Sequence, residues 1–154
     1  MANFQIVVGT VNGHALMAAQ GAMAILMKAG HSVEVNQETT PADLSRDRSE
    51  VILVCCSTTD QGKMPRNIYP LYQALDDGQV DLAGRRYGVI ALGDSYFPPT
   101  QYAMGGITFE NALYSAGAKR IGDIALLDAQ HVQNYSLAAA LWVQEWLKKV
   151  GEAA

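Results

Sequence analysis

The sequence predicts an α/β fold of the doubly wound class, in which a five-stranded parallel sheet lies between two layers of helices. Short apolar segments alternate along the chain with longer segments of helical periodicity, which is typical of chains built from successive strand–helix units. Three of the apolar segments are almost continuously hydrophobic. Such segments are characteristic of parallel strands that are buried on both faces of a sheet.

Five segments are expected to form the strands, and right-handed crossovers are expected to connect them. These are residues 4–8, 32–36, 50–56, 87–92 and 121–127. Four segments carry apolar side chains at helical spacing. These are residues 14–29, 66–76, 106–116 and 136–149. The polar stretch 37–48 is expected to hold only a short or irregular crossover.

The length and composition favour one domain over residues 1–154. Hydrophobic residues make up 49% of the chain and charged residues 17%, a balance found in folded rather than disordered chains. No apolar stretch approaches the roughly 20 residues that span a bilayer, and the first residues lack the basic region of a signal peptide. We therefore expect a cytoplasmic protein without a membrane partner. The net charge of −4, without clustered Lys and Arg, argues against a nucleic-acid partner.

Two adjacent cysteines, Cys55 and Cys56, lie within the expected strand 50–56. Neighbouring side chains on a strand point to opposite faces of the sheet, and a redox pair more typically has the spacing C-x-x-C. We therefore expect two reduced thiols packed in the core. No spacing of His, Cys, Asp or Glu indicates a metal site.

The first loop, residues 10–14, joins the first expected strand to the first expected helix. It matches neither G-x-G-x-x-G nor G-x-x-x-x-G-K-S/T, the two common nucleotide-binding signatures. Thr10 offers a hydroxyl, Asn12 an amide and residues 11–15 several backbone N–H groups, a set that suits a phosphate monoester. An ordinary turn in which Thr10 or Asn12 caps the helix is an equal alternative.

The second loop, residues 56–65, follows the third expected strand. Ser57, Thr58 and Thr59 offer hydroxyls, and residues 60–62 form a turn that can present backbone groups to a flat polar heterocycle. Taken alone, this stretch is better explained as an ordinary polar turn.

The third loop, residues 91–102, follows the fourth expected strand and carries Tyr96, Phe97 and Tyr102. These aromatic rings could stack on a ligand, or they could pin the loop to the domain. Ligands of doubly wound sheets bind beyond the carboxyl ends of the strands, where the strand order reverses. The three loops together therefore favour a binding site there.

Three segments, in this order and spacing, resemble the flavodoxin family, in particular short bacterial flavodoxins of the MioC type and the flavodoxin domain of sulfite reductase flavoprotein. They are G-T-V-N-G, S-T-T-D-Q-G-K-M-P and Y-G-V-I-A-L-G-D-S-Y. The resemblance covers nearly the whole chain. It implies strand order 2-1-3-4-5, FMN as the cofactor, and a monomeric one-electron carrier rather than an enzyme. The implied donor is an NADPH-dependent flavodoxin/ferredoxin reductase, and the acceptor enzyme is unidentified.

The resemblance also implies which residues bind FMN. The phosphate would be held by Thr10, Val11, Asn12, Gly13, His14 and Ala15. One edge of the flavin ring would be lined by Thr58, Thr59, Asp60, Gln61 and Gly62. The other edge would be covered by Gly93, Asp94 and one aromatic residue among Tyr96, Phe97 and Tyr102. Of these three, Tyr96 is preferred.

His14 departs from the family pattern, which usually has a hydroxyl or small residue there. A phosphate dianion would favour the imidazolium form of this side chain. The sequence favours the other interpretation, a side chain that points into water, because the start of a helix repels cations.

Three other functions compete with the carrier. A phosphorelay receiver shares the length and topology but needs acidic residues after the first and third strands, where this chain has Gly9-Thr10 and Ser57-Thr58. A flavin-dependent quinone-type reductase would need NADPH contacts, and the chain shows no basic site for a 2′-phosphate. An FMN-free interaction module is the remaining alternative, because the third loop departs from the family pattern.

Overall fold

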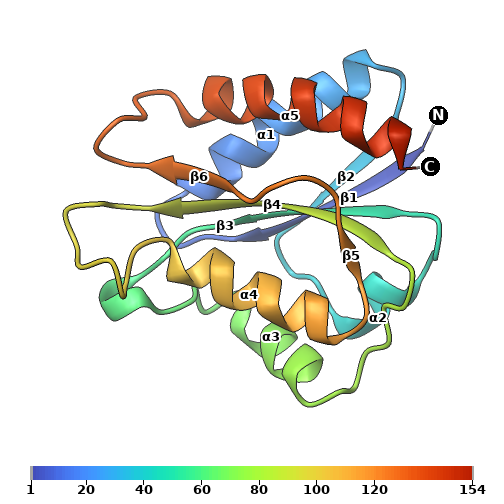
Figure 1. The fold of residues 1–154 in the computed structure, drawn as a ribbon, viewed down its shortest axis with the longest axis horizontal. Helices are drawn as coiled ribbons and strands as arrows, with labels where there is room; N and C mark the ends of the chain where they lie inside the picture. Colours follow the sequence, from blue (N-terminus) through green and yellow to red (C-terminus); the bar gives the residue numbers. More distant parts are fainter. Residues whose placement is uncertain (1, 154) are drawn as a thin grey trace.

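A parallel sheet forms the middle layer of the computed structural model, which describes residues 2–153 apart from the side chain of Asp60 (Figure 1). Its strands are β1 (Asn3–Gly9), β2 (Ser32–Asn36), β3 (Val51–Cys56), β4 (Arg86–Gly93), β5 (Lys119–Arg120) and β6 (Ala125–Asp128). All neighbours pair in parallel in the order β2-β1-β3-β4-β5, and β6 also pairs with β4. The expected order 2-1-3-4-5 is confirmed.

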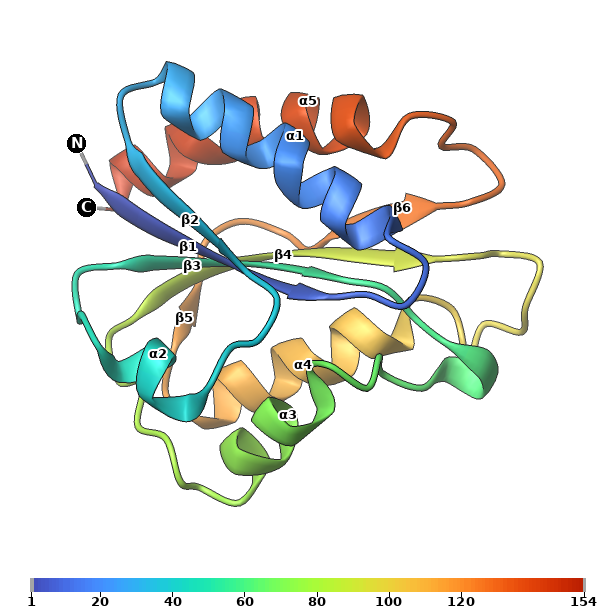
Figure 2. The same ribbon diagram turned by 180° about the vertical axis from the view of Figure 1, so that it is seen from behind.

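Helices cover both faces of the sheet, as the doubly wound prediction requires (Figures 1 and 2). One face carries α1 (His14–Lys28) and α5 (Tyr135–Glu152), and the other carries α2 (Pro41–Ser45), α3 (Tyr69–Asp76) and α4 (Met104–Ser115). Each layer of helices encloses its own hydrophobic cluster against the sheet. Every residue of the central strand β3 is buried, which explains its uninterrupted apolar sequence.

Cys55 and Cys56 point into different clusters, one on each side of β3. Both thiols are free and buried, and burial raises the pKa of each well above its ordinary value. The prediction of two core thiols is confirmed.

The fifth strand position differs from the expected continuous strand 121–127. It is shared by β5 and β6, which pair with the two ends of β4 and are separated by residues 121–124. Gly122 lies at φ +75°, outside the extended region, and the indole N–H of Trp146 donates to the Ile121 carbonyl oxygen at 2.9 Å. Gly122 takes the backbone out of the extended conformation, and Trp146 binds the carbonyl oxygen of the preceding residue. The strand is therefore interrupted at this point.

The second expected helix is also shorter than the predicted 66–76, because α3 begins only at Tyr69. Residues 65–68 form a separate turn, in which the Ile68 N–H donates to the Pro65 carbonyl. Pro70 lies in the first turn of α3, where its missing N–H costs nothing.

Two kinds of feature are absent from the part of the chain that the structure describes. No helix there combines the length and the apolar character that crossing a bilayer requires. Among the described side chains, which exclude that of Asp60, no three from His, Cys, Asp or Glu gather as metal ligands would.

Candidate functional site

A cavity of about 460 Å³ lies at the carboxyl ends of β1, β3 and β4, where the three loops meet. The green turn at residues 60–62 and the yellow loop after β4 flank this end of the sheet, on the left of Figure 1 and on the right of Figure 2. This volume lies within the range of small-molecule sites, about 300–1,000 Å³. The cavity therefore occupies the place that the topology predicts for a ligand.

Most of the predicted site residues line this cavity. They are Thr10, Val11, Asn12, His14, Thr58, Thr59, Gln61, Gly62, Gly93, Asp94 and Phe97. The side chain of Asp60 lies outside the described part of the chain. Gly13, Ala15, Tyr96 and Tyr102 are not among the lining residues. The wall is completed by Ser57, a hydroxyl of the second loop that the FMN-binding set left out, and by four residues that the sequence did not indicate, Leu92, Gln101, Ala129 and Tyr135.

The first loop leaves the amino end of α1 uncapped. The N-cap residue is Gly13 at φ +88°, a conformation that favours glycine, and no side chain caps the helix. Thr10 Oγ accepts a hydrogen bond from the N–H of Gly13 at 2.9 Å. It therefore closes the loop and does not cap the N–H groups in the first turn of α1. The N–H groups of residues 11, 12, 14 and 15 have no acceptor within the described part of the chain. Unpartnered N–H groups at a helix start bind anions well.

Asn67 fixes the first loop from a distant part of the chain. Its side-chain oxygen accepts from the Thr10 N–H at 3.0 Å, and its amide donates to the carbonyl oxygens of Val8 at 2.7 Å and Gln37 at 2.9 Å. Asn67 and Thr10 are 57 residues apart. No local signal in the sequence indicates this contact.

Thr58 joins the floor of the cavity to the start of α4. Its hydroxyl donates to the Leu92 carbonyl oxygen and accepts from the Gly105 N–H, both at 3.0 Å. A Cβ at residue 105 would collide with the Ser57 carbonyl oxygen, so only glycine allows this close approach. These two hydrogen bonds connect the end of β4 to the start of α4, so Thr58 has a structural role that does not depend on a ligand.

The second loop makes a tight turn at the cavity edge. The Thr59 N–H donates to the Lys63 carbonyl at 2.7 Å, and the Gly62 N–H donates to the Thr59 carbonyl at 3.2 Å. Gln61 is held in the left-handed region at φ +62°. The turn is therefore closed by its own backbone, and Gln61 and Gly62 face the cavity.

Two aspartates hold the start of the third loop. Asp94 Oδ1 accepts from the Tyr96 N–H at 2.9 Å and from the Gln130 amide at 2.6 Å. Asp128 Oδ1 accepts from the Ser95 N–H at 3.0 Å. Hydrogen bonds from Ser95 and Gln130 lower the pKa of Asp128 below its ordinary value.

The aromatic residues of the third loop take different positions. Phe97 lines the cavity and is 46% exposed, whereas Tyr96 is 81% exposed and meets Phe97 edge-on at 5.5 Å between ring centres. Tyr102 packs against the cluster beneath α4, where burial raises its pKa. Phe97, and not the preferred Tyr96, is therefore the aromatic ring of this loop that lines the cavity.

His14 forms part of the opposite wall. Its imidazole lies almost parallel to the Tyr135 ring, with 4.7 Å between ring centres and 16° between planes. Burial, followed by the charges of Asp94 and Asp128, raises the pKa of Tyr135, so this ring remains neutral. The His14 side chain is exposed, as expected, but it lies against α5 at the cavity.

Comparison with known proteins decides the family. The family model described as Flavodoxin matches residues 6–142. The chain belongs to the flavodoxin family. Flavodoxin YqcA of Pectobacterium carotovorum is 41% identical over 146 residues, which cover 95% of both chains. Protein MioC of Escherichia coli K12 is 29% identical over 150 residues, covering 96% of this chain and 97% of the relative. A point mutant of a Pseudomonas aeruginosa flavodoxin superposes with a TM-score of 0.86 at 29% identity, covering 96% of this chain and 97% of that structure.

Flavodoxins are electron-transfer proteins rather than enzymes, and their cofactor is FMN. The residues of this flavodoxin fit that cofactor. The unpartnered N–H groups at the start of α1 suit a phosphate, and the cavity beside them has Phe97 and the second loop to flank a ring.

Proposed function

We propose that this flavodoxin takes electrons from an NADPH-dependent flavodoxin/ferredoxin reductase and passes them to an acceptor enzyme, with FMN held in the cavity between the three loops. The uncapped start of α1, opening into that cavity, is the observation that carries the proposal. Anions bind such helix starts because the N–H groups and the helix dipole both favour negative charge.

The proposed assignment follows the walls of the cavity. The N–H groups of residues 11, 12, 14 and 15, with Thr10, Asn12 and His14, would hold the phosphate, and Gly13 would give the loop its left-handed turn. The second loop would line one edge of the ring through Thr58, Thr59, Gln61 and Gly62, and the backbone of Asp60 belongs to the same turn. Gly93, Asp94 and Phe97 would cover the other edge.

FMN supplies the redox chemistry by accepting and releasing single electrons. The protein binds the cofactor, excludes water from its buried parts and presents the open side of the cavity to redox partners. Val11, Tyr96 and Phe97 are large exposed hydrophobic residues on the first and third loops. We assign the docking of donor and acceptor to this rim.

A separate reductase is part of the proposal because the cavity wall, as far as the structure describes it, contains no Lys or Arg. The 2′-phosphate of NADPH is commonly recognised by a basic side chain. An intrinsic quinone-type reductase would need such a group beside the flavin. We further propose that residues 1–154 act as one monomeric domain in the cytoplasm, where the two free thiols would stay reduced.

The first test combines FMN binding with reduction. Purified protein freed of flavin is titrated with FMN, and the flavin absorbance and fluorescence are recorded. We expect one FMN per chain with a sub-micromolar Kd, roughly −8 kcal/mol or better. A protein that shows no FMN binding in this titration would instead support the FMN-free interaction module.

The donor is tested anaerobically on the FMN-loaded protein. NADPH alone should reduce the bound flavin slowly, and NADPH with a catalytic amount of flavodoxin/ferredoxin reductase should reduce it rapidly. Fast reduction by NADPH alone would contradict the carrier proposal and favour the quinone-type reductase.

A further inference from the structure

The cavity wall contains little positive charge to meet a phosphate. Among the described lining residues, Asp94 is the only one that is formally charged at neutral pH, and its charge is negative. A phosphate monoester carries about −1.5 to −2 charges at pH 7. His14 is the one group in this described wall that can become a cation.

His14 also lies beside the proposed phosphate position. It is the first residue of α1, directly after the Gly13 cap, and its own N–H is one of the unpartnered groups of the first loop. Stacking on Tyr135 holds the imidazole against the wall of the cavity. The ring therefore starts from a defined position and loses little freedom when it contacts a ligand.

No carboxylate of the described residues forms an ion pair with His14. Tyr135 is in contact with it and is neutral. The carboxylates that act on Tyr135 belong to Asp94 and Asp128. Asp94 accepts a hydrogen bond from the Tyr96 N–H, and Asp128 accepts from the N–H groups of Ser95 and Gln130. Asp128 also lies 3.9 Å from the exposed imidazole of His131.

No acidic side chain at the start of α1 is placed to pair with a cation at residue 14, because the first turn of the helix contains none. A bound phosphate dianion would supply the missing opposite charge, and opposite charges at short range favour the charged form of a titratable group.

We propose that the His14 imidazole supplies the positive charge opposite the FMN phosphate, so that this flavodoxin binds FMN together with a proton. The inference rests on the proposed placement of FMN in the cavity. It makes His14 a pH-dependent contributor to the distinction between FMN and riboflavin, which has the same ring and no phosphate.

The sign of the pH dependence follows from this coupling. The protonated protein binds FMN better than the neutral form, so FMN affinity falls as pH rises through the range in which imidazole loses its proton. Riboflavin affinity stays constant over the same range.

The test measures Kd for FMN and riboflavin between about pH 6 and pH 8.5, with wild type and His14→Gln. Glutamine keeps a hydrogen-bond donor and removes the charge. The phosphate titrates near pH 6 in both proteins, so the ratio of their FMN Kd values isolates the contribution of His14. We expect the variant to bind FMN about tenfold more weakly than wild type near pH 6 and equally tightly near pH 8.5. A tenfold change in Kd corresponds to about 1.4 kcal/mol. The riboflavin ratio should stay near one.

A second measurement needs no variant. Calorimetric titrations of wild type with FMN near pH 7.5, in two buffers of different ionisation enthalpy, should show proton uptake. Tyr135→Phe, which keeps the stacked ring, should retain the uptake, and His14→Gln should lose it. If His14→Gln fails to fold, as shown by loss of riboflavin binding, the wild-type proton uptake and FMN pH profile decide.

Parallel FMN profiles for the two proteins, or no proton uptake by wild type, would overturn the inference while leaving FMN binding intact. Loss of binding of both flavins by wild type is a different outcome, because it would overturn the proposed function itself.

Discussion

Two adjacent aromatic residues, Tyr96 and Phe97, show how a turn in a loop determines whether a side chain faces a cavity or solvent. Phe97 faces the cavity, and Tyr96 extends into solvent with only the edge of the Phe97 ring against it. Their separation follows from the turn at Asp94, which binds the Tyr96 N–H through its side chain and the Phe97 N–H through its carbonyl. Both residues are good stacking residues by type, so their identity alone could not separate them.

This difference predicts unequal effects on FMN affinity. Phe97→Ala should weaken FMN binding about tenfold, because a stacked ring contributes about 0.5–1.5 kcal/mol beyond the area it buries. Tyr96→Ala is the matched control and should change Kd less than about threefold, an effect below 1 kcal/mol. Fluorescence titration measures both. A larger effect at Tyr96 would show that the third loop rearranges around the cofactor.

At the scale of elements, α1 packs closely against α5 on one face of the sheet. Gly21, in the middle of α1, lies so near the start of α5 that an added Cβ would collide with the Ser136 carbonyl oxygen. The obstacle is backbone, which cannot move aside as a flexible side chain could. The same helix pair places Tyr135 beside His14, so this packing also shapes the cavity.

Gly21→Ala should therefore lower the free energy of unfolding by about 2 kcal/mol, despite the better helix propensity of alanine. Gly151→Ala provides the control, because a Cβ at this α5 position meets nothing within 4 Å. That variant should be neutral or slightly stabilising. Urea unfolding followed by circular dichroism gives both values, and equal stability of the two variants would show that α1 and α5 can move apart freely.

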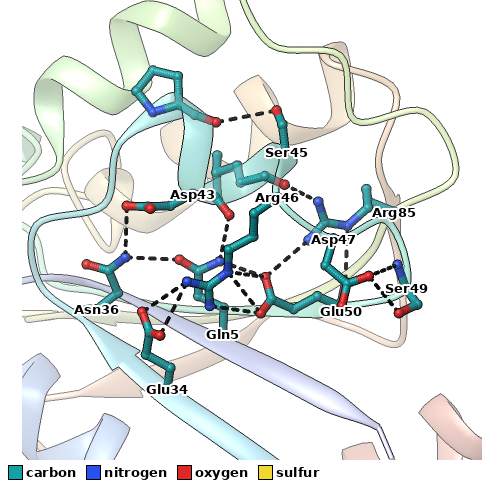
Figure 3. A network of polar contacts seen from close by, with 12 residues as sticks. Gln5, Glu34, Asn36, Asp43, Ser45, Arg46, Asp47, Ser49, Glu50 and Arg85 are labelled. Atoms are coloured by element: carbon teal, nitrogen blue, oxygen red, sulfur yellow. Dashed lines mark hydrogen bonds and ion pairs between the residues drawn. The ribbon is translucent and has the colours of Figure 1, made fainter.

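At the scale of the whole molecule, a polar network lies at the end of the sheet opposite the cavity (Figure 3). Arg85, which is 2% exposed, donates to the carbonyl oxygens of Leu44 and Glu50. The buried Glu50 carboxylate lies 3.7 Å from Arg85, accepts from Gln5 at 2.8 Å and pairs with Arg46 at 2.9 Å. The network therefore joins β1, α2 and the starts of β3 and β4, whereas the cavity lies beyond the ends of these strands.

Removing this network should affect stability but not cofactor binding. Arg85→Met leaves two carbonyls without a donor and Glu50 with one cation fewer, so we expect a loss of about 3 kcal/mol in unfolding free energy. FMN affinity, measured well below the unfolding transition, should stay within about twofold of wild type, less than 0.5 kcal/mol.

Arg48→Met is the control for this change of side chain, because Arg48 is exposed. It should alter neither stability nor binding. An Arg85→Met protein that binds FMN much more weakly would show that the two ends of the sheet are energetically coupled.

The sequence alone determined the features that depend on local pattern. The apolar segments located β1, β3 and β4 closely, because a strand that is buried on both faces needs hydrophobic residues at nearly every position. The burial of the adjacent cysteines and the position of the three loops could also be predicted, since strand periodicity and the topology of the sheet determine where these residues lie.

Only the tertiary structure decided the features that depend on residues far apart in the chain. Trp146 binds the backbone at the break in the fifth strand position, and Asn67 fixes the first loop across 57 residues. Tyr135 turns His14 from a side chain expected in water into part of the cavity wall. Such contacts leave no periodic signal, because each arises only when the packed sheet and helices bring two distant residues together.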